Sequence, residues 1–133
     1  MITFLSNNAK AVFISEKGFI HPNFTAHKFA EEIHYKGWAS NYLVKQQEIE
    51  NEHKVSTRRW KVIKCKNCIY VNVLDTFCND GWCSPIDETG TVPLLRDNHH
   101  LSLFGSYKLS KNIKKNVKKM FDFIERSTST ALF

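Results

Sequence analysis

The six residues Ile69-Tyr70-Val71-Asn72-Val73-Leu74 constrain the fold of this chain more than any other stretch. β-Branched and aromatic side chains of this kind fit the pleated surface of a sheet, so we predict a β-strand here. A second apolar run, Lys10–Ser15, lies between Asn7-Asn8 and Gly18 and is typical of a buried strand in a parallel sheet. The turn-rich region Asn79–Thr91 follows the stronger of the two strands.

Helices are expected to flank these strands. From Ser40 to about Lys64 apolar residues recur in a polar background without glycine or proline, which predicts one long helix or two helices joined near Ser56-Thr57. From about Leu103 to Arg126 apolar residues recur at three- and four-residue steps, which predicts a long C-terminal helix. The stripe of that helix consists of Leu109, Ile113, Val117, Met120 and Ile124.

The segment Phe24–Gly37 has apolar residues at mixed spacings and is expected to be a loop with at most one helical turn. The predicted order is therefore strand, helix, strand, loop, helix. Such an order is typical of an α/β fold in which helices cover a parallel sheet.

A polar segment before the last helix places a carboxylate, Asp97, three residues before an imidazole, His100. A short turn would let Asp97 accept a hydrogen bond from one ring nitrogen of His100 and leave the other nitrogen to act as a general base. Ser102 is expected to cap the following helix, and Pro93 disfavours helix ahead of the polar segment. We therefore expect the pair on a loop at the carboxyl ends of the strands, where sites form in such sheets, with His99 exposed to solvent.

The string Leu94–Ser102, with Gly105 after it, resembles the last block of the SGNH hydrolase family, where Asp-x-x-His supplies two members of a Ser-His-Asp triad. Upstream, Val71–Cys83 is similar to one branch of that family. This branch is the SGNH domain fused behind the membrane-embedded acyltransferase domain of bacterial lipopolysaccharide and peptidoglycan O-acetyltransferases. The resemblance extends from about Ile69 to Ile124 and implies part of a flavodoxin-like, three-layer α/β/α fold.

The resemblance also implies a function for the intact parent protein. The parent would move an acetyl group from an acyl donor onto a sugar hydroxyl of a cell-surface polysaccharide such as the lipopolysaccharide O-antigen, without a cofactor. His100 would take the proton from a serine and later from the incoming hydroxyl, while Asp97 would orient the ring; Arg96 and Trp82 are plausible neighbours of this site. The parent is expected at the periplasmic face of the inner membrane, although Met1–Asn8 lacks the basic region and apolar core of a signal peptide.

Two blocks of that family are missing from these 133 residues. The sequence contains no Gly-Asp-Ser, which carries the serine nucleophile, and no Gly-x-Asn-Asp, the block that would supply an oxyanion-hole donor. We therefore expect residues 1–133 to be the carboxyl-terminal portion of a single SGNH-type domain, a fragment without its upstream nucleophile half and membrane acyltransferase domain. A base without these groups performs no acyl transfer, so the chain alone is expected to be inactive.

The four cysteines are spaced as Cys-x2-Cys and Cys-x4-Cys, which invites a zinc site. However, an extended strand at roughly 3.3 Å per residue would hold Cys68 and Cys78 about 30 Å apart, too far for one ion. Cys78 and Cys83 flank a tight turn and match a cysteine pair common in the resembling branch, where the domain faces an oxidising compartment, so we expect a disulfide there. Cys65 and Cys68 could form a second disulfide, a redox pair or two unpaired thiols.

The net charge of +6 comes from 19 Lys and Arg against 13 Asp and Glu, and it is concentrated in Lys54–Lys66 and Lys108–Lys119. Such a balance permits binding to anionic polysaccharide, lipid headgroups or nucleic acid. Aromatic residues do not interleave with the lysines of the last helix as they do in a stacking platform, so nucleic acid is not favoured. The alternative functions are a small basic module that binds glycan or nucleic acid and, less favoured, a cysteine-based zinc module.

Overall fold

Two parallel strands, β1 (Val12–Lys17) and β3 (Cys68–Asn72), form the centre of the structure. The computed structural model describes residues 1–129, and it confirms both predicted strands and the α/β fold. The second strand ends at Asn72, earlier than expected. The Asn72 side chain accepts a hydrogen bond from the Leu74 N–H (3.2 Å), and this contact starts the 3-10 helix η1 (Val73–Thr76).

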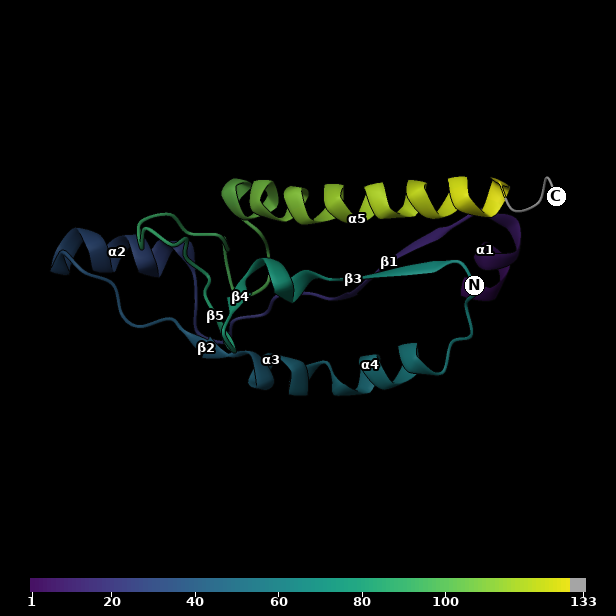
Figure 1. Cartoon of the computed structure of the whole chain (residues 1–133). Coiled ribbons are helices and arrows are strands. Elements are labelled where there is room, and N and C mark those ends of the chain that lie inside the picture. Colours follow the sequence, from purple (N-terminus) through teal and green to yellow (C-terminus); the bar gives the residue numbers. More distant parts are fainter. Residues whose placement is uncertain (130–133) are drawn as a thin grey trace.

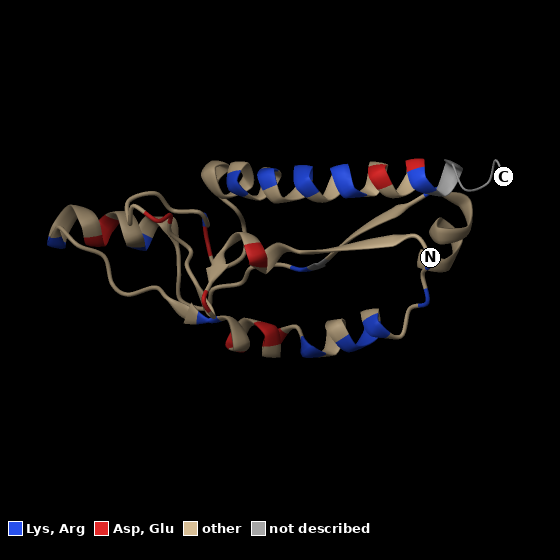
Figure 2. Ribbon diagram, in the orientation of Figure 1, with Lys and Arg blue, Asp and Glu red and all other residues tan. Residues whose placement is uncertain are grey.

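Helices cover both faces of this parallel pair, as the order of elements predicts (Figure 1). The long helix α5 (Leu103–Ser129) lies along one face, and α3 (Gln46–Glu52) and α4 (Lys54–Lys61) lie along the other. Lysines and arginines lie along both α5 and α4 (Figure 2). In α5 the predicted stripe is only partly buried, and Ile113 is 37% exposed.

The predicted loop between residues 24 and 37 is wrong, because this segment forms the helix α2 (Ala26–Lys36). Thr25 Oγ1 accepts the Lys28 N–H (3.1 Å) at its start, and Gly37 ends it with a left-handed φ of 74°. The helix buries Phe29 and the side chain of Glu32. The capping residues at its two ends therefore identify this helix, whereas the irregular spacing of its apolar residues does not.

The predicted helix from Ser40 to Lys64 is two helices, but it begins at Gln46 and is broken at His53 rather than near residues 56 and 57. The residues from 39 to 43 form neither helix nor strand, and two of them bind α2 instead. The Glu32 carboxylate accepts hydrogen bonds from the Ser40 N–H (2.8 Å), from the Ser40 hydroxyl (2.7 Å) and from the Tyr42 hydroxyl (2.9 Å).

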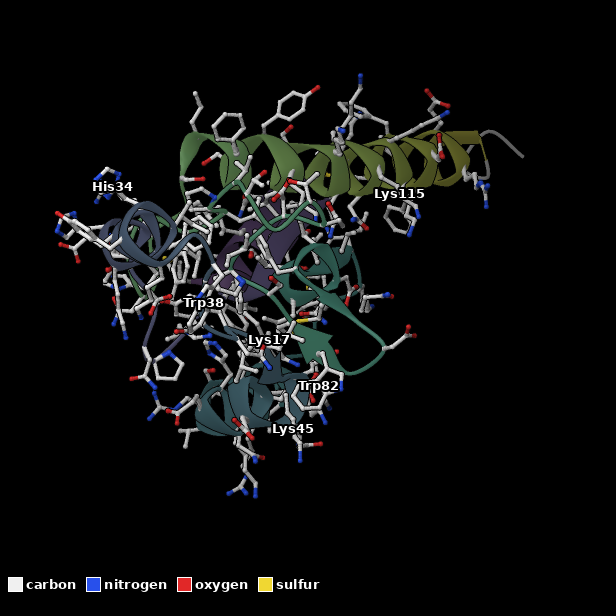
Figure 3. The ribbon with its side chains drawn as sticks, turned by 90° about the vertical axis from the view of Figure 1, so that its left-hand side faces the viewer. Lys17, His34, Trp38, Lys45, Trp82 and Lys115 are labelled. Atoms are coloured by element: carbon white, nitrogen blue, oxygen red, sulfur yellow. A yellow bond between two sulfur atoms is a disulfide. The ribbon has the colours of Figure 1, made fainter. Side chains whose placement is uncertain are left out.

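A small antiparallel sheet follows at the carboxyl-end side of β1 and β3 (Figure 1). It contains β2 (Val44–Lys45), β4 (Cys78–Asn79) and β5 (Trp82–Cys83), with β5 in the middle. Asp80 and Gly81 both have positive φ, 49° and 81°, as the two-residue type I′ hairpin turn requires. On its outer side Lys45 Nζ lies 5.9 Å from the Trp82 ring (Figure 3).

Helix α5 is fixed at its start by a close backbone contact. The Ser102 hydroxyl accepts the Gly105 N–H (3.1 Å), which confirms the predicted cap, and it donates to the Pro93 carbonyl (2.6 Å). Gly105 is buried, and a Cβ built on it would stand 1.9 Å from the Leu94 carbonyl oxygen. Glycine is thus required there for space, because the helix packs directly on the chain that precedes it.

We expect Gly105→Ala to lower the free energy of unfolding by about 1–3 kcal/mol, because backbone must move to admit the methyl group. The control is Ser106→Ala at the neighbouring exposed position, which should leave stability nearly unchanged. Helix propensity alone predicts the opposite sign for Gly105→Ala, a gain of up to about 1 kcal/mol. Denaturant unfolding of both variants distinguishes the two outcomes, and a stabilised Gly105→Ala would contradict the packing described.

The Glu32 hydrogen bonds should make stability depend on pH. The Ser40 N–H, and then the Ser40 hydroxyl, lower the pKa of Glu32 to about 2, against the opposing effect of burial. A carboxyl whose pKa is lowered by folding stabilises the fold fully above its unfolded pKa of 4.5, and this stabilisation is lost as the pH falls toward 2. We expect Glu32→Gln to be less stable than the natural chain at pH 7, with a difference that narrows between pH 4.5 and 2. A difference in unfolding free energy that stays constant over this range would contradict this assignment.

Candidate active site

The segment that carries Asp97 and His100 is a tight turn built on buried residues. Leu94 and Leu95 before the turn belong to the hydrophobic core, with Leu95 fully buried. Leu95 pairs with Leu101 in an antiparallel bridge, and the His100 carbonyl accepts the Arg96 N–H (2.8 Å). The turn is therefore closed at its base before any side chain at its tip is considered.

Neighbouring backbone holds the turn from outside. The Asn98 carbonyl accepts the His21 N–H (2.8 Å), and the Arg96 carbonyl accepts the Ala26 N–H at the start of α2 (2.9 Å). On the other side, the Leu94 carbonyl accepts the Ser102 N–H (2.9 Å) just before α5. The turn is thus attached to α2 and α5 through main-chain groups, which fixes its orientation whatever its exposed side chains are.

The Asp97 carboxylate contacts the His100 ring directly. His100 Nδ1 lies 2.9 Å from Asp97 Oδ2 and 3.0 Å from Oδ1. Asp97 Oδ1 also accepts the backbone N–H groups of His100 (2.9 Å) and His99 (3.1 Å). These two N–H groups, helped by the His100 ring and opposed by burial, hold the pKa of Asp97 well below its ordinary value. The carboxylate is therefore ionised at neutral pH and aimed at Nδ1.

The other nitrogen of His100, Nε2, has no hydrogen-bond partner among residues 1–129. The His100 side chain is 55% exposed, so a reacting group can reach this atom. A neutral imidazole that donates Nδ1–H to a carboxylate presents Nε2 as a proton acceptor. This arrangement can do the work of a general base.

The turn lies beside the carboxyl end of the parallel strands, as expected. A hollow of about 270 Å³ is lined by Lys17 and Gly18 at the end of β1, by Val73 after β3, and by His99 and Leu101 from the turn. Ser15 and Lys17 border the hollow from the strand itself. In an open parallel sheet, this edge is where ligands bind.

Two residues named as plausible neighbours of the site fall in different places. Arg96 Nε lies 3.7 Å from Asp97 Oδ2, so its guanidinium is next to the site. Trp82 instead lines a separate hollow of about 440 Å³ over the small sheet, together with Asp75 and Lys108. None of the residues from 94 to 102 lines that second hollow.

His99 is exposed, as expected, and its ring also lies close to Asp97 and His100. Its Nδ1 lies 3.6 Å from Asp97 Oδ1, and its ring centroid is 3.9 Å from that of His100. The rings tilt by 42°, and His99 Nδ1 also contacts the Asn98 side chain (2.5 Å). The sequence contained a signal for this contact: two adjacent histidines stand two and three residues after an aspartate. A tight turn brings both imidazoles back toward the same carboxylate.

The cysteines form two disulfides, Cys65–Cys68 and Cys78–Cys83, and none is free among the described residues. The sequence argument about zinc assumed an extended strand through Phe77. That premise is wrong, because the chain turns into η1 after Asn72. Disulfide formation uses all four sulfurs, so the structure presents no thiolate for a metal. The one group of ligand atoms that could hold an ion in the described residues is Asp97, His99 and His100.

The pair lacks a serine positioned for nucleophilic attack. The serine two residues after His100, Ser102, is used as the helix cap and bonds the Pro93 carbonyl. Ser15 lines the adjacent hollow without a hydrogen bond to His100. The described site therefore contains an imidazole oriented by a carboxylate, the arrangement that two members of a catalytic triad adopt.

Comparison with known proteins gives one family match. The family described as "SGNH domain (fused to AT3 domains)" matches residues 1–115, which include the turn and the start of α5. No curated protein and no solved structure matches this chain. Across residues 1–129, no helix has both the length and the apolar character needed to cross a bilayer.

The contact between Asp97 and His100 predicts a tautomer. In the neutral His100 ring the proton should reside on Nδ1, which nitrogen-15 NMR of the imidazole measures at alkaline pH. Asp97→Asn keeps an acceptor for the backbone N–H groups but removes the charge, so the share of the Nε2–H tautomer should rise. Asp75→Asn is the control, because Asp75 contacts Asn72 instead. A natural chain whose neutral His100 carries its proton mainly on Nε2 would contradict the described geometry.

Proposed function

Because the chain belongs to the family of SGNH domains fused to AT3 domains, we propose that Asp97 and His100 are the acid–base part of a Ser-His-Asp triad. The observation that carries this proposal is the His100 ring itself, with Nδ1 on the Asp97 carboxylate and Nε2 open to solvent. The family makes the chain an acyltransferase-associated module. The proposed reaction is the transfer of an acyl group from a donor to a hydroxyl group.

The reaction divides into two steps, and in each step His100 Nε2 takes up one proton and then returns it. His100 Nε2 takes the proton from a serine hydroxyl as the serine oxygen attacks the acyl carbonyl, and returns this proton to the donor's leaving group. Nε2 then takes the proton of the acceptor hydroxyl as its oxygen attacks the acyl-serine, and returns it to the serine as the new ester leaves. Asp97 stays ionised throughout and stabilises the charged ring in both steps.

The serine is proposed to come from a Gly-Asp-Ser segment outside these 133 residues, because the sequence contains no such block. Residues 1–133 would then be the carboxyl-terminal portion of the domain. The parallel sheet is consistent with this proposal: among the described residues it has two strands, so β1 and β3 each keep one unpaired edge. An upstream half could add its strands there and bring its serine to the same end of the sheet.

The acceptor is proposed to be a sugar hydroxyl of a cell-surface polysaccharide, such as the lipopolysaccharide O-antigen, and the acyl group to be acetyl. The parent protein would act at the periplasmic face of the inner membrane, next to its membrane acyltransferase domain. Two disulfides support an oxidising compartment, because such bonds rarely persist in a reducing cytosol. We propose that part of the sugar lies in the hollow beside the turn, which is lined by Lys17 and His99.

We expect esterase activity when an upstream half that bears Gly-Asp-Ser, from an SGNH domain fused to an AT3 domain, is joined ahead of Met1. Hydrolysis of p-nitrophenyl acetate is the measurement. His100→Ala and Asp97→Asn should each lower kcat/KM of the fusion by a factor of about 10⁴. Asp75→Asn is the matched control and should retain the activity, because the Asp75 carboxylate bonds Asn72 rather than a residue of the turn.

A fusion whose activity survives His100→Ala would contradict the proposed role of the pair. The competing function is a basic module that binds glycan or nucleic acid through its lysines. That function predicts binding that weakens with added salt and is unaffected by His100→Ala.

A further inference from the structure

Three atoms able to bind a metal ion converge on the turn that holds the proposed base. They are one Asp97 carboxylate oxygen, a nitrogen of His99 and a nitrogen of His100, and all lie within 4.8 Å of one another. His100 Nδ1 is 2.9 Å from Asp97 Oδ2, and His99 Nδ1 is 3.6 Å from Asp97 Oδ1. Both imidazoles thus hold the same nitrogen, Nδ1, near one carboxylate, although the nearer contact of His99 Nδ1 is the Asn98 side-chain oxygen.

The two nitrogen–oxygen separations are close to those between ligands of a tetrahedral metal site. Zinc binds imidazole nitrogen and carboxylate oxygen at about 2.0–2.2 Å, which places neighbouring ligand atoms about 3.3–3.5 Å apart in a tetrahedron. Measured to the same oxygen, Asp97 Oδ1, the distances are 3.0 Å from His100 Nδ1 and 3.6 Å from His99 Nδ1, on either side of that value. Coordination requires the His99 ring to turn away from the Asn98 side chain. The backbone N–H groups of His99 and His100 already bond Asp97 Oδ1 and close the turn. The ion therefore needs to order little of the backbone when it binds.

We propose that Asp97, His99 and His100 bind one divalent transition-metal ion of the Zn²⁺ type, and that this ion switches off the base. Water would occupy the remaining position. Two imidazoles and one carboxylate favour zinc, copper or nickel over magnesium and calcium, which prefer oxygen ligands. The metal-binding part stands on the geometry of the turn alone, and the inhibitory part rests on the proposed function.

The inhibition follows from which nitrogen of the His100 ring carries the proton when a metal is bound. A metal on His100 Nδ1 takes the lone pair of that nitrogen, so the neutral ring carries its remaining proton on Nε2. Nε2 is the atom that accepts the serine proton in the proposed reaction. Metal binding therefore converts the acceptor into a donor and occupies the Asp97 carboxylate at the same time.

Two neighbouring groups oppose the ion. The Asn98 side-chain oxygen lies 2.5 Å from His99 Nδ1 and competes for that nitrogen. Arg96 Nε lies 3.7 Å from Asp97 Oδ2 and competes for that oxygen. The Arg96 side chain is 70% exposed, so it can move into solvent when a cation binds. His21, in contrast, is buried against the Tyr42 carbonyl and contacts the turn through its backbone N–H, so its ring is not a fourth ligand.

Calorimetric titration of the 133-residue chain with Zn²⁺ tests the binding. We expect one ion per chain and a dissociation constant that rises at least about tenfold in His99→Ala, since even loss of an outer-shell partner commonly costs that much. Asp97→Asn should weaken binding similarly. His27→Ala is the matched control, because His27 Nε2 lies 3.4 Å from Glu31 and forms the competing exposed histidine–carboxylate pair.

Nitrogen-15 NMR of the His100 ring supplies the second readout: Zn²⁺ should shift Nδ1 to the coordinated range and leave the proton on Nε2. Equal affinity for the natural chain and His99→Ala, absence of stoichiometric binding, or coordination through His100 Nε2 would each overturn the proposal. In the active fusion, each protein is compared with its own rate without zinc, and Zn²⁺ should lower the rate of the natural sequence at concentrations that do not lower the rate of His99→Ala. Because the titration contains no substrate, failure of metal binding is distinguishable from failure of the acyl-transfer proposal.

Discussion

The site depends on one carboxylate that holds a four-residue turn together. Asp97 accepts two backbone N–H groups, from His99 and His100, and the same side chain accepts Nδ1 of His100. The bonds that shape the turn therefore also orient the ring. Because the N–H groups stabilise the ionised carboxylate, its charge is present before any substrate arrives. Asp97 thus contributes both to the shape of the turn and to the orientation of the His100 ring.

The rest of the molecule fixes where this turn stands. Leu95 is buried in the core below it, and the α5 backbone at Gly105 packs on the Leu94 carbonyl behind it. The turn is thereby placed beside the carboxyl ends of β1 and β3, where a hollow opens. A side chain at the tip can be exposed and still be precisely placed, because its precision comes from main-chain contacts at the base of the turn.

Local signals allowed the strands, the last helix, its Ser102 cap and the position of the turn to be predicted from the sequence. Helix α2 was missed because its evidence lies at its ends, in Thr25 and Gly37, while its apolar spacing is irregular. The non-helical segment at residues 39–43 is bound by Glu32, which lies eight or more positions earlier in the chain, and the local sequence pattern does not reveal such a contact. The nearness of the His99 ring to the carboxylate depends on the geometry of the folded turn, so residue type alone did not reveal it.

The central claim is that His100 activates a serine supplied by another segment of the same domain. Labelling of that serine by a fluorophosphonate measures this activation directly, in a protein that joins a Gly-Asp-Ser half to this chain. The account predicts rapid labelling of the natural sequence, labelling slower by a factor of about 10³ or more after His100→Ala, and an unchanged rate after Asp75→Asn. Equal labelling rates with and without the His100 imidazole would contradict it.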